Sequence, residues 1–313
     1  MVADEPGSSL NTAISILSDR FDVVAVANNV DAAIGATLSL RADVVVLNTA
    51  LDDSAPPIWA KQLETGGLYP RIVLVSNDIY DASVLAALER GVAAVVAKSR
   101  VTLDLPTAVS QVHAGGRFIP SAALLPRWLS RLERRHDLQM YRTDRHLLGA
   151  VASYFATALE AGDSILAIAT PPLLEELDTY VASHRFDPSA LRAAGRYATL
   201  DSSLALDAVC RNGVPDPALW AAALDPLVER ALAAATGAAP RVTAFGQMAP
   251  ILCDRGEFDA MVRLERIADA YAAARTVSIL CAYSTDCLGG GDNELAARIH
   301  HEHVTVVPAD AAA

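Results

Sequence analysis

The chain has 313 residues, of which 52% are hydrophobic, and its formal net charge is -12 at pH 7. This length suits two domains of ordinary size with a core each, and the composition excludes a mainly disordered chain. The acidic balance and the lack of a basic patch argue against binding to the phosphate backbone of nucleic acid. The apolar runs are far shorter than the ~20 residues that span a bilayer, and the N-terminus MVADEPGSSL has no basic apolar leader. We therefore expect a cytoplasmic protein without membrane contact.

The cysteines form no CxxC pair and no regular framework; they are Cys210, Cys253, Cys281 and Cys287. This pattern is typical of a reduced protein in which most thiols are buried. Cys281, in the apolar stretch LCAY, is expected in the core, with a redox role as the lesser alternative.

Apolar runs alternate with segments of helical period along residues 7 to 114. The predicted strands are FDVVAVA, ADVVVLN, RIVLVS and GVAAVVAK, and the predicted helices cover about 31–40, 56–66, 81–90 and 104–114. This alternation predicts a parallel sheet covered by helices on both faces. Because ligands bind outside the carboxyl ends of such strands, the candidate site residues of this half are Asn48, Ser76 and Lys98, with Asp4 and Glu5 near the start.

These residues resemble the response-regulator receiver domain over residues 1–120, in the subgroup whose last helix is followed by a tail like AGGRFIPSAALL. The resemblance implies a flavodoxin-like, doubly wound fold. In that family an acidic pair binds Mg²⁺, an aspartate at the end of the third strand accepts a phosphoryl group, and a Ser or Thr and a Lys end the next two strands. Asp4, Glu5, Ser76 and Lys98 match these positions, and Asn48 occupies that of the phosphoacceptor.

Asn48 changes the chemistry of this site. A neutral carboxamide is a poor nucleophile and brings no charge to a magnesium site, so we expect a receiver that is not phosphorylated. Asp52 and Asp53 belong to the following loop and third helix, and are weak candidates for a surrogate acceptor. We hypothesise that Lys98 donates a hydrogen bond to the carbonyl oxygen of Asn48; a solvated strand end is the alternative for this lysine.

The predicted first strand is short, because only Met1 and Val2 precede the acidic residues. Strands of globular proteins commonly have about five residues. Either the native chain therefore starts upstream, or the central strand of this sheet is shortened.

Residues 121–135 connect the two halves. An amphipathic linker helix is predicted there instead of a flexible tether, because apolar side chains lie near helical spacing at Leu124, Leu125, Trp128, Leu129 and Leu132. Such a helix either fixes the two domains or carries motion between them, and a helix that simply packs on one domain is the alternative.

Residues 136–313 again alternate strand and helix signals. The strand signals are SILAIAT, RYATLD, PRVTAFGQM and VSILCAY, and helix-period segments such as LLGAVASYFATALEAG and LLEELDTYVASH separate them. A phosphate-binding loop (P-loop) needs GxxxxGK[ST], because its glycines turn backbone N–H groups to the phosphates and its lysine neutralises them. The turn ATPPLLEEL has two prolines, no glycine and no lysine, so nucleotide binding is not expected there.

The stretches LEAGDSILAIATPP, NGVPDPALW, FGQM, LERIADAY, LCAY and HEHVTVVPAD follow one another along residues 136–310. Together they resemble the MEDS domain, a sensory domain shared by methanogen and methylotroph regulators and by a dichloromethane-responsive repressor. The resemblance implies a RecA/KaiC-like α/β core that lacks the ATPase loop and senses small, hydrocarbon-like molecules. Gln247 follows the FG pair where the family commonly has a glutamate, which argues against a catalytic carboxylate there.

Candidate pocket residues of this half lie at strand ends, in loops or at the entrance of the domain: His136, Tyr141, Thr170, Asp201, Asp216, Gln247 and Tyr283. His136 and Tyr141 are candidates to line one pocket; a histidine that starts a helix and a core tyrosine are the alternatives. The segment HHEH at 300–303 has metal-like ligands, but adjacent histidines of one short segment rarely complete a site without further ligands. We therefore expect no metal and no cofactor.

We expect a two-domain α/β protein, with a pseudo-receiver at 1–120 and a MEDS-type sensory domain at 136–313, that transmits a signal without catalysis. Its expected partners are a sensor histidine kinase or a transcription regulator, and a small hydrophobic ligand. A homodimer through parts of residues 81–114 is expected, because receiver domains typically pair by that face. A residual nucleotide-hydrolysing RecA-like enzyme is the alternative, against which the missing phosphate loop argues. A DNA-binding transcription factor is a third reading, and the net acidity argues against it.

Overall fold

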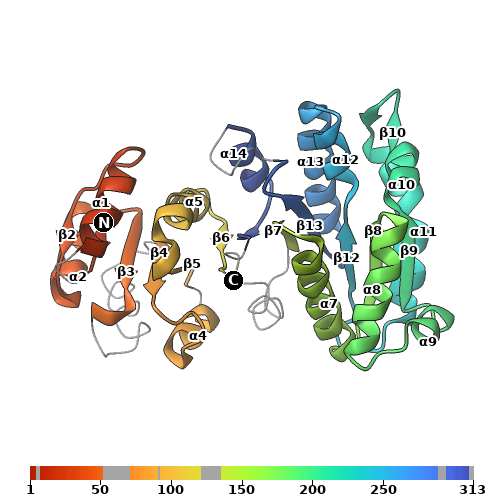
Figure 1. Cartoon of the computed structure of the whole chain (residues 1–313), viewed down its shortest axis with the longest axis horizontal. Helices are drawn as coiled ribbons and strands as arrows, with labels where there is room; N and C mark the ends of the chain where they lie inside the picture. The colour runs from red at the N-terminus through yellow and green to blue at the C-terminus, as the bar shows by residue number, and fades with distance from the viewer. Residues whose placement is uncertain (5–7, 52–70, 91, 121–134, 288–293, 310–313) are drawn as a thin grey trace. The chain divides into compact units, whose positions relative to one another are not determined.

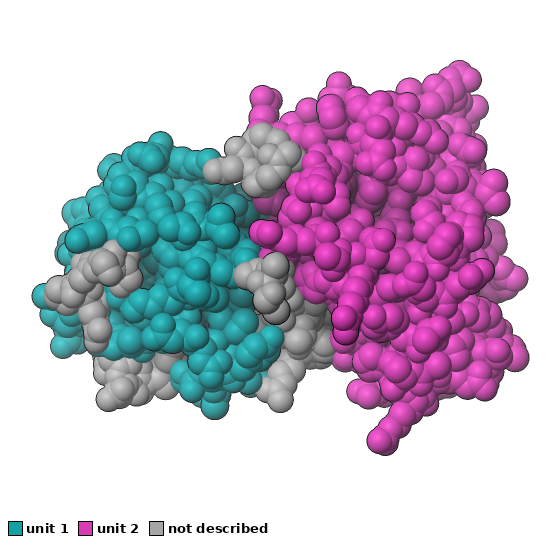
Figure 2. Space-filling model, in the orientation of Figure 1, with its two compact units in different colours: residues 1–120 teal, residues 121–313 magenta. Residues whose placement is uncertain are grey.

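The computed structural model of the chain describes residues 1–4, 8–51, 71–90, 92–120, 135–287 and 294–309 (Figure 1). The chain divides into two compact units, residues 1–120 and 121–313, which Figure 2 colours separately. In each unit helices alternate with strands that pair in parallel, so the predicted α/β class is confirmed. Glu5 and nearly all of the predicted linker helix at 121–135 lie outside the described residues.

The first unit has a parallel sheet in the strand order β2-β1-β3-β4-β5-β6. Its described strands are β1 (Val2–Ala3), β2 (Val26–Ala27), β3 (Val44–Asn48), β4 (Arg71–Ser76), β5 (Ala94–Ala97) and β6 (Arg117–Phe118). Its described helices are α1 (Ser8–Ser18), α2 (Val30–Leu40), α4 (Ala82–Glu89) and α5 (Val101–His113), with single 3-10 turns at Thr49–Leu51 and Lys98–Arg100. The predicted helices near 31–40, 81–90 and 104–114 are thus confirmed, and the one near 56–66 lies outside the described part.

Strand β1 has two residues and lies between β2 and β3. Val2 and Ala3 are nearly inaccessible to solvent, with 2% and 1% of their surface exposed, so this short strand is central to the core. Strand β2 is an edge strand whose partner β1 offers only two residues. The predicted strand FDVVAVA is therefore wrong over most of its length, and only Val26–Ala27 pair.

The second unit has its own parallel order, β14-β7-β13-β12-β8-β9. Its strands are β7 (Arg135–Tyr141), β8 (Ser164–Ala169), β9 (Tyr197–Asp201), β12 (Val242–Gly246), β13 (Val277–Ser284) and β14 (Thr305–Val307), with a small antiparallel hairpin of β10 (Cys210–Arg211) and β11 (Val214–Pro215). Its described helices are α7 (Asp144–Glu160), α8 (Pro171–Ser183), α9 (Pro188–Ala193), α10 (Ser202–Val209), α11 (Pro217–Ala234), α12 (Met248–Asp254), α13 (Phe258–Ala274) and α14 (Glu294–His301).

Helices cover both faces of this second sheet (Figure 1). Helix α7 leads from β7 across to β8, whereas α13 leads back from β12 to β13. Because parallel crossovers are right-handed, these opposite directions place α7 and its neighbour α8 on one face, and α11 and α13 on the other. The core of the unit therefore has two layers, one under each pair of helices.

A disulfide joins Cys253 at the end of α12 to Cys287 after β13, with the two Cα atoms 6.2 Å apart. Cys210 is half-buried and Cys281 is buried, and both are free thiols. The expectation of a fully reduced chain is therefore wrong for one pair. Spacing could not reveal this pair, because the two cysteines are 34 positions apart and the chain between them folds back as α13 and β13 to bring them together.

None of the described helices combines the length and the apolar character needed to cross a bilayer.

Candidate functional site

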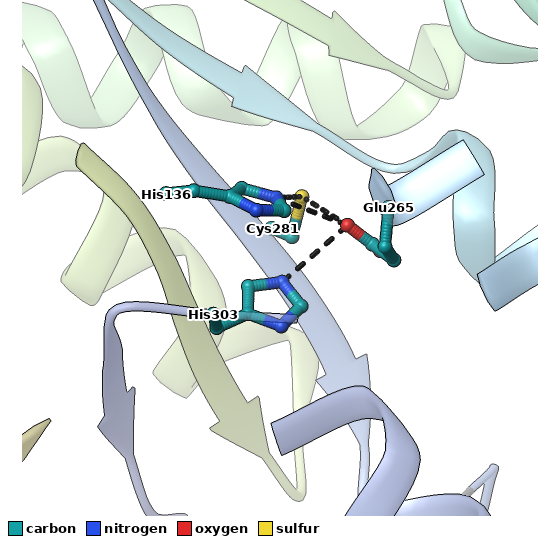
Figure 3. Close-up of side chains that lie close together, drawn as sticks. All are labelled: His136, Glu265, Cys281 and His303. Atoms are coloured by element: carbon teal, nitrogen blue, oxygen red, sulfur yellow. Dashed lines mark hydrogen bonds and ion pairs between the residues drawn. The ribbon is translucent and has the colours of Figure 1, made fainter. Parts of the chain in front are cut away.

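Four buried polar side chains of the second unit converge beneath helix α13 (Figure 3). His136 comes from β7, Cys281 from β13, Glu265 from α13, and His303 from the segment between α14 and β14. Their exposed fractions are 0%, 7%, 1% and 3%, respectively. We call these four residues the His-Glu-Cys cluster.

The sheet register places two members of the cluster on one face. His136 lies opposite Ile279, and Cys281 lies opposite Leu138 on the neighbouring strand. Since side chains alternate between the faces of a strand, His136 and Cys281 point to the same side, toward α13. The backbone N–H of Val304 donates to the carbonyl oxygen of His136 at 2.7 Å, and this bond holds His303 beside His136, with ring centroids 4.2 Å apart.

One oxygen of Glu265 is the centre of the cluster. Glu265 Oε2 lies 3.0 Å from Nε2 of His136 and 3.4 Å from Nε2 of His303, and it accepts a hydrogen bond from the Cys281 thiol at 3.3 Å. The other oxygen, Oε1, accepts a hydrogen bond from the hydroxyl of Tyr283. Figure 3 shows both imidazole rings and the thiol directed at this single carboxylate oxygen.

The backbone fixes the remaining ring nitrogen of each histidine. Nδ1 of His136 lies 3.0 Å from the carbonyl oxygen of Glu302, and Nδ1 of His303 lies 2.7 Å from that of Ile299. Each Nδ1 therefore donates, because a carbonyl oxygen only accepts. The rings are held so that both Nε2 atoms face the cluster.

Burial and mutual contact shift the titration of these groups. Burial lowers the pKa of His136. Burial also acts to lower the pKa of His303, but the charge and hydrogen bond of Glu265, together with smaller contributions from Ile299 and Asp137, outweigh it, so that the net shift is upward. Burial acts to raise the pKa of Glu265, yet the two imidazoles outweigh it and the pKa falls well below its usual range. Burial and the nearby carboxylate raise the pKa of Cys281 and of Tyr283. The two imidazoles therefore favour the ionised form of Glu265.

An apolar cavity of about 40 Å³ adjoins the cluster, between the sheet and helices α11 and α13. Glu265 and Cys281 form part of its wall. The rest is mostly apolar and comes from β8, β12, β13, α11, α12 and α13, with Trp220, Phe245, Ala268 and Tyr271 among the lining side chains. A molecule in this cavity would touch two members of the His-Glu-Cys cluster.

Glu265 was not among the predicted site residues, although the sequence around it contains a signal. The buried positions of α13 include Met261, Leu264, Ala268 and Tyr271, which recur at the helical spacing of an apolar stripe. Glu265 falls on this stripe, and a carboxylate on a buried helix face requires a partner. The HHEH segment that contains His303 was a candidate, but its partners lie on elements that are distant in the sequence, so the spacing could not connect it to them.

The predicted pocket residues are not brought together as one site. His136 and Tyr141 belong to one strand and lie five positions apart, an odd offset, so they point to opposite faces of the sheet. The prediction that they line one pocket is wrong, as is the alternative in which His136 starts a helix. Tyr283 joins the cluster through Glu265, whereas Tyr141 and Gln247 lie at the carboxyl edge of the sheet and contact each other.

Asp201 and Asp216 are helix caps in this structure. Asp201 accepts the backbone N–H groups of Ser203 and Leu204 at the start of α10. Asp216 does the same at the start of α11 and also pairs with Arg211. Both carboxylates satisfy backbone donors that a helix start would otherwise leave free, which gives them a structural role.

The turn after β8 has no room for a phosphate-binding loop. Strand β8 ends at Ala169, the exposed Thr170 caps α8, and the prolines at 171 and 172 form its first turn. A single residue thus connects strand and helix, and a proline has no N–H to offer a phosphate. This geometry argues against nucleotide binding at this place.

The predicted receiver-like site is assembled in part in the first unit. Asp4, Asn48 and Ser76 are buried, and the Asn48 amide donates to Oδ1 of Asp4. Asn48 Oδ1 accepts the backbone N–H of Ala50 at 3.0 Å. The hypothesis that Lys98 binds this oxygen is not supported, because the described residues contain no hydrogen bond between Lys98 and Asn48; Lys98 is half-buried at the start of its 3-10 turn.

The fold and the cluster define an α/β domain with a buried polar centre. Residues 135–301, a little over half of the chain, match the family model of MEDS, the MEthanogen/methylotroph, DcmR Sensory domain. The chain belongs to the MEDS family. The match contains His136, Glu265 and Cys281, and His303 lies two residues beyond its end. No curated protein and no solved structure matches the chain.

Proposed function

We propose that the chain is a non-enzymatic signalling protein. In this proposal the second unit senses a small apolar molecule, and the first unit is a receiver that is not phosphorylated and that relays the signal through protein contacts. Membership of a sensory-domain family supports the signalling role. The rest depends on the cavity of the second unit and on Asn48 in the first.

The observation that carries the ligand proposal is the apolar cavity beside the His-Glu-Cys cluster. A water molecule needs roughly 10–15 Å³ of volume measured in this way, so the cavity of about 40 Å³ suits a molecule of about two or three heavy atoms. Apolar walls select against charged ligands. Trp220, which is 4% exposed, lines the cavity, and its side chain would become less mobile when a ligand is bound.

Dichloromethane, with three heavy atoms, is the probe for this proposal, and benzene is the probe of excessive size. We expect dichloromethane to raise the melting temperature of the full chain in a saturable manner, because a ligand that binds only the folded state stabilises it. Ala268→Leu fills the cavity wall from α13 and should abolish the effect. Ala273→Leu, on an exposed position of the same helix, is the matched control and should retain it.

Two outcomes would contradict the ligand proposal. One is an equal response to dichloromethane in the wild type and in Ala268→Leu. The other is the absence of any saturable response to dichloromethane in the wild type.

The strand order of the first unit supports the receiver proposal. The order β2-β1-β3-β4-β5 is that of flavodoxin-like sheets. Asn48 stands at the end of the third strand, where its amide holds Asp4. Because a carboxamide cannot form an acyl phosphate, incubation with acetyl phosphate and Mg²⁺ should leave the intact mass unchanged. A phosphoryl adduct would refute this part of the proposal.

We further propose that the chain forms a homodimer through parts of residues 81–114 and acts on a sensor histidine kinase or a transcription regulator. The likeness of the second unit to RecA/KaiC-like cores remains a prediction. Light scattering of the full chain tests the dimer directly, and a monomer at micromolar concentration would refute it.

A further inference from the structure

The ring nitrogens and the carboxylate of the His-Glu-Cys cluster turn acceptor atoms toward one another. Both Nδ1 atoms donate to backbone carbonyls, so each neutral imidazole presents the lone pair of Nε2 to the centre. Both lone pairs face Oε2 of Glu265, at 3.0 and 3.4 Å, and a carboxylate oxygen also only accepts. These facing lone pairs favour a cation between them, either a proton or a metal ion.

We propose that His136, Glu265, Cys281 and His303 form a binding site for one divalent transition-metal ion, with zinc as the best match. Zinc in proteins takes four nitrogen, sulfur and oxygen ligands in a tetrahedron, and these residues offer two imidazole nitrogens, one sulfur and one carboxylate oxygen. The proposal is independent of the apolar ligand and of the receiver-like unit.

The distances between the donor atoms fit such an ion. Zinc bonds of about 2.0–2.3 Å separate the ligands of a tetrahedron by roughly 3.3–3.8 Å. In the cluster the closest donor pairs are 3.0 to 3.4 Å apart, and all four donors lie within 4.8 Å of one another. The close pairs need shifts of a few tenths of an ångström to complete the tetrahedron, and the widest pair, at up to 4.8 Å, must close by about 1 Å.

The surroundings of the cluster also match a metal site. Metal-bound histidines almost always donate their other N–H to a carbonyl or carboxylate, as both histidines do here. Tyr283 donates to the second oxygen of Glu265 and orients that ligand in the same way. With the thiol deprotonated, one thiolate and one carboxylate balance the two positive charges of the ion, so a buried site carries no net charge.

The ligands come from rigid elements and from one late segment of the chain. His136, Cys281 and Glu265 belong to β7, β13 and α13, whereas His303 lies just before β14. An ion would therefore tie the C-terminal segment to the sheet. All four positions are taken by protein, which is typical of zinc sites that stabilise a fold.

The test is a titration of the untagged full chain, freed of metal with EDTA, with Co²⁺ and then with Zn²⁺. We expect one equivalent of Co²⁺ to produce the intense visible bands of a tetrahedral site and a near-ultraviolet band from cobalt and thiolate. One equivalent of Zn²⁺ should remove both, and elemental analysis should find one zinc per chain after dialysis. The absence of these bands in the wild type would overturn the proposal without any variant.

Two pairs of variants assign the ligands. Cys281→Ser should lose the thiolate band, whereas Cys210→Ser, at the other free thiol, should keep it. His303→Ala should lose the tetrahedral bands, whereas His301→Ala, at an exposed neighbour in the HHEH segment, should keep them. Retention of the bands in both Cys281→Ser and His303→Ala would place the metal elsewhere and overturn the proposal. If a variant fails to fold, the melting temperature of the wild type is the replacement measurement. It should rise with Zn²⁺ and should not rise with Mg²⁺.

Discussion

Replacing Asn48 with aspartate is the sharpest probe of the first unit, because it converts a hydrogen bond into a clash of charges. Asn48 and Asp4 are 2% and 5% exposed, and the Asn48 amide donates to Asp4. In Asn48→Asp two carboxylates would face each other at about 3 Å. Their repulsion would reach about 5–6 kcal/mol at an effective dielectric constant of roughly 20.

Protonation limits this cost. One carboxyl group of the variant can keep a proton and donate it to the other, which restores the hydrogen bond. Holding that proton at pH 7 against an ordinary aspartate pKa of about 3.9 costs about 4 kcal/mol, less than the repulsion. We therefore expect Asn48→Asp to lower the free energy of unfolding by about 4 kcal/mol at pH 7.

The sign of the pH dependence follows from proton binding. The folded variant binds one proton more than the unfolded chain above pH 4, so its stability relative to the wild type falls as the pH rises, by about 1.4 kcal/mol per pH unit. Near pH 4 the difference should vanish. Mg²⁺ should restore stability at pH 7, because two adjacent carboxylates are ligands for this ion, and it should not affect the wild type.

The assay is urea unfolding of the full chain between pH 4 and pH 8, followed by far-ultraviolet circular dichroism in EDTA and then in Mg²⁺. Asn28→Asp makes the same chemical change at an exposed position and should stay within about 0.5 kcal/mol of the wild type. A variant as stable as the wild type at pH 7 without Mg²⁺ would refute the buried contact between Asn48 and Asp4.

Three further predictions concern the second unit. Without reductant, a thiol reagent should label the denatured chain at two cysteines, and after reduction at four. Reduction should also lower the free energy of unfolding by about 3–4 kcal/mol, because the Cys253–Cys287 bond closes a loop with a sequence separation of 34. Four reactive thiols without reductant would contradict the disulfide. Tyr283→Phe removes a donor to the buried Glu265 carboxylate and should lower the free energy of urea unfolding by about 2–3 kcal/mol. Tyr180→Phe, at a half-buried position, is the control and should change it little. Equal effects of the two variants would argue against the hydrogen bond between Tyr283 and Glu265. Asp201→Ala removes a helix cap and should lower the free energy of unfolding by about 1 kcal/mol, while the response of the melting temperature to dichloromethane should stay unchanged. Loss of that response would show that Asp201 is a pocket residue.

Much of the architecture was readable from local patterns. Apolar runs alternating with helix-period segments predicted parallel α/β folding, and the structure bears this out in both units. The chemical consequence of Asn48 also followed from residue type and place alone. The missing phosphate loop was equally visible, since two prolines at 171 and 172 exclude the required backbone donors whatever the rest of the chain does.

The candidate site was decided by tertiary structure. Rules for parallel sheets directed attention to the carboxyl ends of the strands, where Asp201 proved to be a helix cap. The His-Glu-Cys cluster lies on a sheet face instead, beneath α13. Its donors belong to β7, α13, β13 and the segment before β14, and the most distant two, His136 and His303, are 167 positions apart along the chain.

The physical reason is that local periodicity reports which face of an element is buried, but not what it is buried against. The sequence by itself determined the α/β class and the alternation of elements. Only the pairing of β7 between β13 and β14, with α13 packed above them, decided that the carboxylate of Glu265 meets two histidines and a thiol. Contacts of that kind depend on strand order, and strand order is set by long-range packing, which no short stretch of sequence encodes.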